Sequence, residues 1–282
     1  MLSDKKPYDI ILFGVTGFTG KLTVEYLLVN YSSSSSLKWA ACARNPSKAQ
    51  TILDDIVTTC NAKAVAAAEA SASDLPPTLV APPLLTADLV CTTAEQEETL
   101  TQIVLQTKVV LTCSGPFEKY GTTLVKICAE NGVHYADITG ETDFVRSTIQ
   151  NWDAVARKNG AALVHHCGND CVPQDLTVFE MNEYAKKQGG ELVSVHTFGE
   201  FSAGSTYSGG TLATAQYQLG KDRKSQVKPD FDPLLTTPEG TKSEYITKNV
   251  SPREVVTDPD LERKVGPWIM APVMANCVRR SK

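Results

Sequence analysis

The chain has 282 residues, of which 42% are hydrophobic and 21% charged, a composition that is ordinary for a folded globular protein and argues against a disordered chain. Its formal net charge of −5 argues against nucleic acid as a partner, because a surface that binds a phosphate backbone needs clustered basic side chains. No apolar run reaches the roughly 18 residues of a membrane-spanning helix, and the nearest, residues 268–278, is interrupted by Pro272.

The amino terminus and the cysteines indicate where the protein is made. Residues 1–10 do not form the basic start and long apolar core of a secretory signal, so we expect a cytoplasmic protein. The eight cysteines contain no CxxC pair, and several lie in apolar runs, which predicts reduced, buried thiols. His165 and His166, beside Cys167 and Cys171, do not predict a metal site, because adjacent strand residues point to opposite faces.

Apolar runs alternate with segments of helical spacing from residue 8 onward. Residues 8–14 predict a strand buried on both faces, and Leu22, Tyr26 and Val29 follow at helical intervals. The segments expected next are a strand over 37–43, a helix over 46–60, a loose connection rich in Ala, Ser and Pro over 61–83, and a third strand near 83–88.

Three further strands complete the pattern, two of them followed by helices that end at glycines. The expected strands are 108–113, 133–138 and 161–167, and the expected helices are 121–132 and 144–160, with Gly132 and Gly160 as their stops. Six strands alternating with helices predict an α/β fold over residues 1–172, namely the doubly wound parallel sheet of an NAD(P)-binding Rossmann domain.

The rhythm changes after residue 172. We expect a helix over 173–190, a strand over 191–198 and a short helix over 211–219, whereas residues 221–264 show little apolar periodicity. Residues 173–282 therefore predict the start of a second, α+β domain for substrate or dimerisation. Its thin core suggests that this domain is incomplete in the chain.

Three glycines spaced three apart separate the first strand from the first helix. Gly14 would permit a sharp turn, Gly17 a close approach of the backbone to a pyrophosphate, and Gly20 close packing of helix on strand. The helix N-terminus would add N–H groups and a favourable dipole. We therefore expect a dinucleotide site that also uses Thr16, Phe18 and Thr19, although a glycine-rich turn that binds nothing is the alternative.

The end of the second strand carries basic residues where an NAD-binding domain usually carries an acid. Arg44, Asn45 and Lys48 would suit a 2′-phosphate, which favours NADP over NAD, unless these charges are simply solvated. Asp88 could contact the adenine edge. The turn after the fourth strand lies where the nicotinamide half is expected, and it comprises Ser114, Gly115 and Pro116.

Three segments resemble one family of proteins. Residues 14–20 (GVTGFTG), 109–141 and 167–176 (CGNDCVPQDL) are similar to the saccharopine dehydrogenase-like oxidoreductases, which include the bacterial trans-acting enoyl reductases. The resemblance covers nearly the whole chain. It implies a Rossmann domain that binds NADP, a second α/β domain, and relatives that continue beyond residue 282.

The resemblance also implies an activity. It indicates hydride transfer from NADPH to a C=N or an activated C=C bond of a small molecule or a lipid. Association with membranes or lipid droplets, as in animal relatives, and formation of a homodimer are further expectations. The alternative is a non-catalytic NADP-binding scaffold protein at lipid droplets, whose cofactor loop would look the same.

No proton donor is marked by a motif. Tyr120, Glu141, His166 and Asp170 lie near predicted strand ends and are the candidates, but Asp170 could cap the following helix and His166 could be an ordinary strand residue. Tyr217 and Lys221 have the Tyr-x-x-x-Lys spacing of short-chain dehydrogenases. We do not expect them to be catalytic, because Gly220 would end the helix between them.

Overall fold

The computed structural model describes residues 6–31, 37–71, 76–200, 208–221, 252 and 254–281. The chain divides into two compact units that alternate along the sequence. The first comprises Met1–Asp137, Asn151–Val164 and Ser208–Leu219, and the second comprises Ile138–Gln150, His165–Tyr207 and Gly220–Lys282. The division into functional domains at residue 172 stays a prediction.

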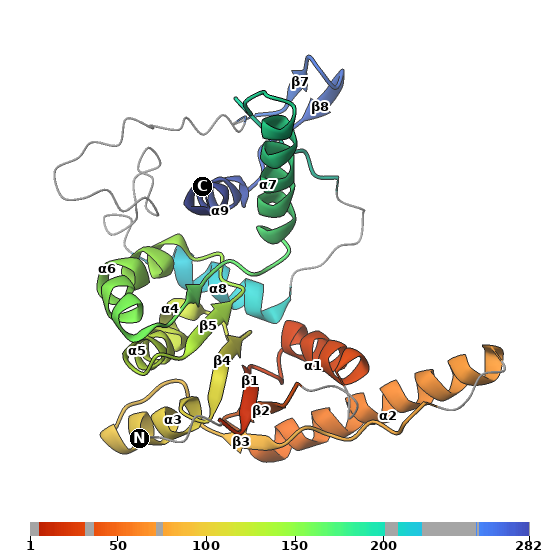
Figure 1. Ribbon diagram of the computed structural model, residues 1–282, viewed down its shortest axis with the longest axis vertical. Helices are drawn as coiled ribbons and strands as arrows, with labels where there is room; N and C mark the ends of the chain where they lie inside the picture. The colour runs from red at the N-terminus through yellow and green to blue at the C-terminus, as the bar shows by residue number, and fades with distance from the viewer. Residues whose placement is uncertain are drawn as a thin grey trace. The chain divides into compact units, whose positions relative to one another are not determined.

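A parallel six-stranded sheet forms the centre of the first unit (Figure 1). Its order, β3-β2-β1-β4-β5-β6, reverses direction beside β1, the doubly wound arrangement expected from the sequence. Tyr8 pairs with Thr107 and Ile10 with Trp39, so β1 is flanked by β4 and β2. The strands are β1 (Tyr8–Phe13), β2 (Trp39–Ala43), β3 (Leu84–Thr86), β4 (Thr107–Thr112), β5 (His134–Asp137) and β6 (Leu163–Val164).

Helices cover both faces of this sheet. α1 (Phe18–Asn30) packs against α2 (Pro46–Ser71), whereas α3 (Ala94–Val104) packs against α5 (Thr122–Glu130). The remaining helices are the single turn α4 (Phe117–Tyr120) and the 18-residue α6 (Thr142–Asn159), which both units share. Because both faces are covered, consecutive strand residues such as Ile11 and Leu12 are both fully buried.

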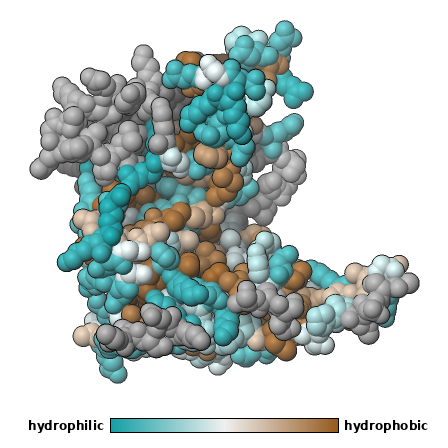
Figure 2. Space-filling view, viewed as in Figure 1, coloured by the Kyte–Doolittle hydropathy of each residue, from teal (hydrophilic) through white to brown (hydrophobic). Residues whose placement is uncertain are grey.

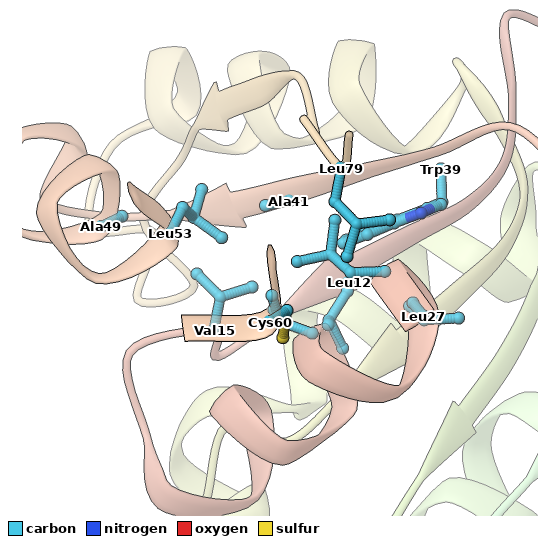
Figure 3. Close-up of a cluster of buried hydrophobic side chains, with 11 residues drawn as sticks. Leu12, Val15, Leu27, Trp39, Ala41, Ala49, Leu53, Cys60 and Leu79 are labelled. Atoms are coloured by element: carbon cyan, nitrogen blue, oxygen red, sulfur yellow. The ribbon is translucent and has the colours of Figure 1, made fainter. Parts of the chain in front are cut away.

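One half of the core lies between the sheet and the first two helices (Figure 3). Leu12 and Ala41 project from neighbouring strands toward this layer, where Leu27 of α1 and Leu53 of α2 meet them. Trp39 closes the cluster at the amino end of β2. These contacts hold α1 against the strand that precedes it, so the turn between them has a defined shape.

The second helix is longer than predicted. Residues 61–71 continue α2 rather than forming a loose connection, because this stretch is rich in alanine, the strongest helix former, and contains no proline. In Figure 1, α2 continues beyond the edge of the sheet. The chain returns at Leu79, whose backbone is held by the side-chain amide of Asn61 through bonds of 2.8 and 3.1 Å.

The second unit is built mainly from helices. α7 (Val172–Lys187) packs against α9 (Ala271–Ser281), and β7 (Val256–Asp258) pairs antiparallel with β8 (Arg263–Val265). The predicted strand over 191–198 is wrong, since these residues form no regular element. The hairpin was missed because its strands have three residues each, too few to show an alternation of apolar and polar side chains.

Candidate dinucleotide site

The turn after β1 is tightly closed. Gly14 adopts φ +85°, and a Cβ at this position would lie 2.6 Å from Ser114 Oγ and 2.9 Å from the Cys113 carbonyl carbon. A Cβ on Gly20 would overlap the carbonyl oxygen of Gly14. The spacing of these two glycines therefore has the mechanical roles inferred from the sequence: a left-handed turn and close packing of helix on turn.

The first turn of α1 presents its backbone to the outside. Gly17 is the N-cap residue and makes no side-chain capping bond, and the first turn carries no acidic residue. The first backbone bond after the cap runs from Lys21 N–H to the Gly17 carbonyl at 3.0 Å. The preceding N–H groups, of Phe18, Thr19 and Gly20, are thus placed for an anion, as at other phosphate-binding helix ends. Thr16 precedes them in the turn.

The end of β2 carries the basic residues expected for a 2′-phosphate. Arg44 is 71% exposed, and its Nη1 lies 4.0 Å from Asp88 Oδ2, a carboxylate that follows β3. The Asn45 side chain instead accepts the Lys48 N–H at 3.0 Å, so it caps α2. Arg44 is therefore largely exposed at this edge, while Asn45 caps the helix that carries Lys48.

The turn after β4 (residues 113–116) lies against the turn after β1 (residues 14–17). We call these two turns, with the start of α1, the cradle. Ser114 lies beside Gly14, and its N–H donates to Thr112 Oγ1 at 3.2 Å. Gly115 and Pro116 follow, leading into α4. Cys113 is mostly enclosed, and burial raises the pKa of its thiol, which disfavours a nucleophilic role. The structure therefore brings the turn after β1 and the turn after β4 together, as expected from the strand order.

Two of the proton-donor candidates, His166 and Glu141, are each hydrogen-bonded to Thr139 in the second unit. His166 is 5% exposed and has φ +63°, an uncommon backbone conformation for a non-glycine residue. Its Nδ1 lies 2.7 Å from the Thr139 carbonyl oxygen, and the Thr139 hydroxyl accepts the Glu141 N–H at 3.0 Å. Glu141 is itself buried. Because a carbonyl can only accept, His166 Nδ1 carries a proton in this bond.

The neighbouring residue, His165, is also held by a hydrogen bond. Thr148 donates its hydroxyl to the Val145 carbonyl at 2.8 Å, so it accepts from His165 Nε2, which lies 2.9 Å away. The His165 ring also meets Phe144 edge-on, with centroids 5.4 Å apart. Both histidines of the pair are therefore held by specific partners in the second unit.

The other candidates lie in different surroundings. Tyr120 ends α4 in the first unit, where Lys119 Nζ lies 5.2 Å from the centre of its ring. Asp170 is exposed, and the residue that caps α7 is Cys171 rather than Asp170. α8 (Gly209–Leu219) ends before Lys221, which pairs with Asp143 at 3.5 Å, so the Tyr-x-x-x-Lys spacing does not share a helix face.

Neither metals nor membranes are indicated by the described residues. Over these ranges no group of three or more His, Cys, Asp or Glu side chains could hold a metal ion. In the same part of the chain no helix is both long enough and apolar enough to cross a membrane. All eight cysteines are free thiols, four of them buried, and burial raises the pKa of Cys42 to about 12.

Comparison with known proteins identifies relatives of most of this chain. A trans-acting enoyl reductase of Mycobacterium leprae is 31% identical over 268 residues, covering 95% of this chain and 54% of its own. A Mycobacterium tuberculosis protein assigned to the same group is 33% identical over 301 residues, covering 100% of this chain and 62% of its own. The chain thus spans less than two thirds of the length of these relatives.

Solved structures add only a distant likeness. Quinate dehydrogenase from Corynebacterium glutamicum in complex with NAD has a TM-score of 0.31 and 13% identity, covering 57% of this chain and 44% of that one.

The family model for the saccharopine dehydrogenase NADP binding domain matches residues 10–164, which include the whole sheet except the first residues of β1. The match confirms the predicted cofactor, NADP, and the chain belongs to this family of NADP-binding domains.

Proposed function

We propose that the protein is an NADP-dependent reductase that acts on an activated C=C bond, such as that of an enoyl thioester. The single observation that carries the proposal is the tight turn after β1, where Gly14 and Gly20 leave no room for a Cβ and the first turn of α1 presents its N–H groups. When bound there, NADPH would supply the hydride. The names of the relatives, enoyl reductases, support the C=C bond over a C=N bond as the substrate group.

The choice of NADPH over NADH follows from charge. Arg44 follows β2 and extends into solvent, and Lys48 lies in the first turn of α2. A guanidinium can bind a phosphate through two parallel hydrogen bonds, whereas the ribose hydroxyl of NADH offers no charge to neutralise. The ion pair with Asp88 holds the Arg44 side chain near the end of β3. Once a phosphate binds Arg44, this ion pair would be weaker than in the free protein.

A binding experiment tests the cofactor assignment. NADPH and NADH are titrated by fluorescence against the wild-type chain and against Arg44→Ala. We expect the substitution to weaken NADPH by roughly ten- to a hundredfold, the loss of one charge-assisted bond, and to leave NADH unchanged. Arg157→Ala is the matched control, because Arg157 is equally exposed and also paired with a carboxylate. Equal affinities for both nucleotides, insensitive to Arg44, would refute the assignment.

A turnover experiment tests the chemistry. NADPH consumption is followed with enoyl thioesters of increasing acyl length and with imines. We expect oxidation of NADPH with the enoyl series and none with the imines. Tight NADPH binding with no consumption in either series would instead favour a non-catalytic NADP-binding protein.

A further inference from the structure

A helix from late in the chain belongs to the dinucleotide-binding unit. α8 follows α7 in sequence, yet Ser208–Leu219 clusters with the six-stranded sheet rather than with α7. Its first turn is held by Ser208, whose hydroxyl accepts the Thr211 N–H at 3.1 Å. This helix therefore has a defined start and a place in the first unit.

α8 touches the turn after β4. A Cβ on Gly115 would lie 3.5 Å from Thr214 Oγ1 and 3.2 Å from the Phe117 ring. Gly115 follows Ser114, which contacts Gly14 of the first turn. The Thr214 hydroxyl is thus next to the part of the cradle where the strand order places the nicotinamide half of a bound dinucleotide.

The inward face of α8 is polar. Within this helix, all of whose residues the structure describes, Thr214 and Gln218 are half-buried, and every other residue is exposed. The two residues are four apart, so they share one helix face. Leu212 and Leu219 are 57% and 86% exposed. A helix that packs on a core turns its apolar side chains inward, and α8 does the opposite.

The picture supports the same arrangement. In Figure 1, α8 (cyan) lies at the carboxyl ends of β4 and β5. Figure 2 shows apolar side chains at the centre of this face of the dinucleotide-binding unit, with hydrophilic side chains around them. A polar face turned toward the strand ends is typical of a helix that borders a ligand.

We propose that α8 forms one wall of the nicotinamide end of the cofactor site and that the Thr214 hydroxyl hydrogen-bonds the nicotinamide half of NADPH. The inference rests on the proposed function. It adds to the cradle a residue from a segment outside the family match at 10–164. No motif in the sequence indicates Thr214, and only the fold brings it beside Gly115.

Two ligands separate this contact from the rest of the site. NADPH contains the nicotinamide ring, whereas 2′,5′-ADP contains only the adenosine half with its 2′-phosphate. We expect Thr214→Val, which removes the hydroxyl with little change of volume, to weaken NADPH by roughly three- to tenfold, the loss of one hydrogen bond. The affinity for 2′,5′-ADP should stay unchanged, and Thr214→Ser, which keeps the hydroxyl, should restore NADPH binding.

The controls make the outcomes distinct. Thr58→Val makes the same change at an exposed position of α2 and should alter neither affinity. If Thr214→Val weakens both ligands equally, or neither, the inference is wrong while the cradle stands. If the wild-type chain binds neither NADPH nor 2′,5′-ADP, the proposed function fails and the inference fails with it.

Discussion

Gly14 and Ser114 lie so close that a single methyl group on Gly14 would be 2.6 Å from the Ser114 hydroxyl oxygen. The two residues follow β1 and β4, neighbours in the sheet. The turns after these two strands therefore pack directly against each other. Any side chain at position 14 would push the two turns apart.

Gly14→Ala should abolish NADPH binding and destabilise the fold. The new Cβ would meet Ser114 Oγ and the Cys113 backbone in a left-handed conformation, at a cost of about 1–3 kcal/mol. The measurements are urea unfolding and NADPH titration. Gly209→Ala is the control, since no atom lies within 4 Å of its Cβ position. Wild-type affinity in Gly14→Ala would show that the cradle is not the binding site.

Asp9 should make stability depend on pH on the acid side. Its carboxylate accepts a hydrogen bond from Lys108 Nζ at 2.6 Å and another from the Lys38 N–H, and these bonds hold its pKa below the ordinary value. A lowered folded-state pKa stabilises the protein above the unfolded value of about 3.9, and the gain is lost as pH falls through the folded value.

The test compares wild type with Asp9→Asn by urea unfolding from about pH 6 down to about pH 3. The wild-type advantage in free energy of unfolding should shrink as the pH falls. Asp153→Asn, which removes an exposed carboxylate on α6, is the control for a general charge effect. A wild-type advantage that stays constant over this range would contradict the prediction.

Asn61→Ala should destabilise the first unit. The side-chain amide satisfies both the N–H and the carbonyl of Leu79, a residue that contributes to the buried cluster. Leaving these partly buried groups unpaired should cost about 1–3 kcal/mol in urea unfolding. Asn30→Ala is the matched control, because the Asn30 amide makes one exposed bond within its own helix turn. Equal costs in the two variants would argue against the amide's role.

Cys277 should react with iodoacetamide at neutral pH faster than Cys42 or Cys91. The Cys171 thiol donates a hydrogen bond that lowers the pKa of Cys277, despite the opposing effect of partial burial. The thiolate therefore forms at lower pH than in Cys42 or Cys91, whose pKa values burial raises. Peptide mapping by mass spectrometry should find Cys277 labelled before Cys42 and Cys91.

A second variant separates the bond from mere accessibility. Cys171→Ala removes the donor, so labelling of Cys277 at neutral pH should slow. Cys171→Ser keeps a hydroxyl donor and should preserve most of the rate. An unchanged rate in Cys171→Ala would show that exposure alone controls the reaction.

The sheet could be predicted because its signal is local. Each strand is an apolar run followed by a helical pattern, and the stops at Gly132 and Gly160 adopt the expected positive φ of 66° and 74°. The same reasoning failed at 61–71, where alanine was interpreted as loop composition although it extends α2. It failed again at 191–198, where an apolar run has no neighbouring strand to pair with in the described residues.

The candidate site could be predicted only in part. Gly14 and Gly20 show their roles through spacing alone, because the strand and the helix that they join are adjacent in sequence. The capping role of Asn45 and the ion pair of Arg44 with Asp88 depend on where α2 and β3 settle. Thr214 beside Gly115 could not be predicted, because a contact between distant segments leaves no periodicity in the chain.

The pairing of Tyr8 with Thr107 sets an order of events during synthesis. β1 ends at Phe13, but its partner β4 ends only at Thr112. A ribosome that adds about 5–20 residues per second therefore needs several seconds to complete β4. Until then one edge of β1 has no neighbour, and its backbone groups can join another chain. Nascent copies of this protein should therefore need protection from aggregation until residue 112 has left the exit tunnel.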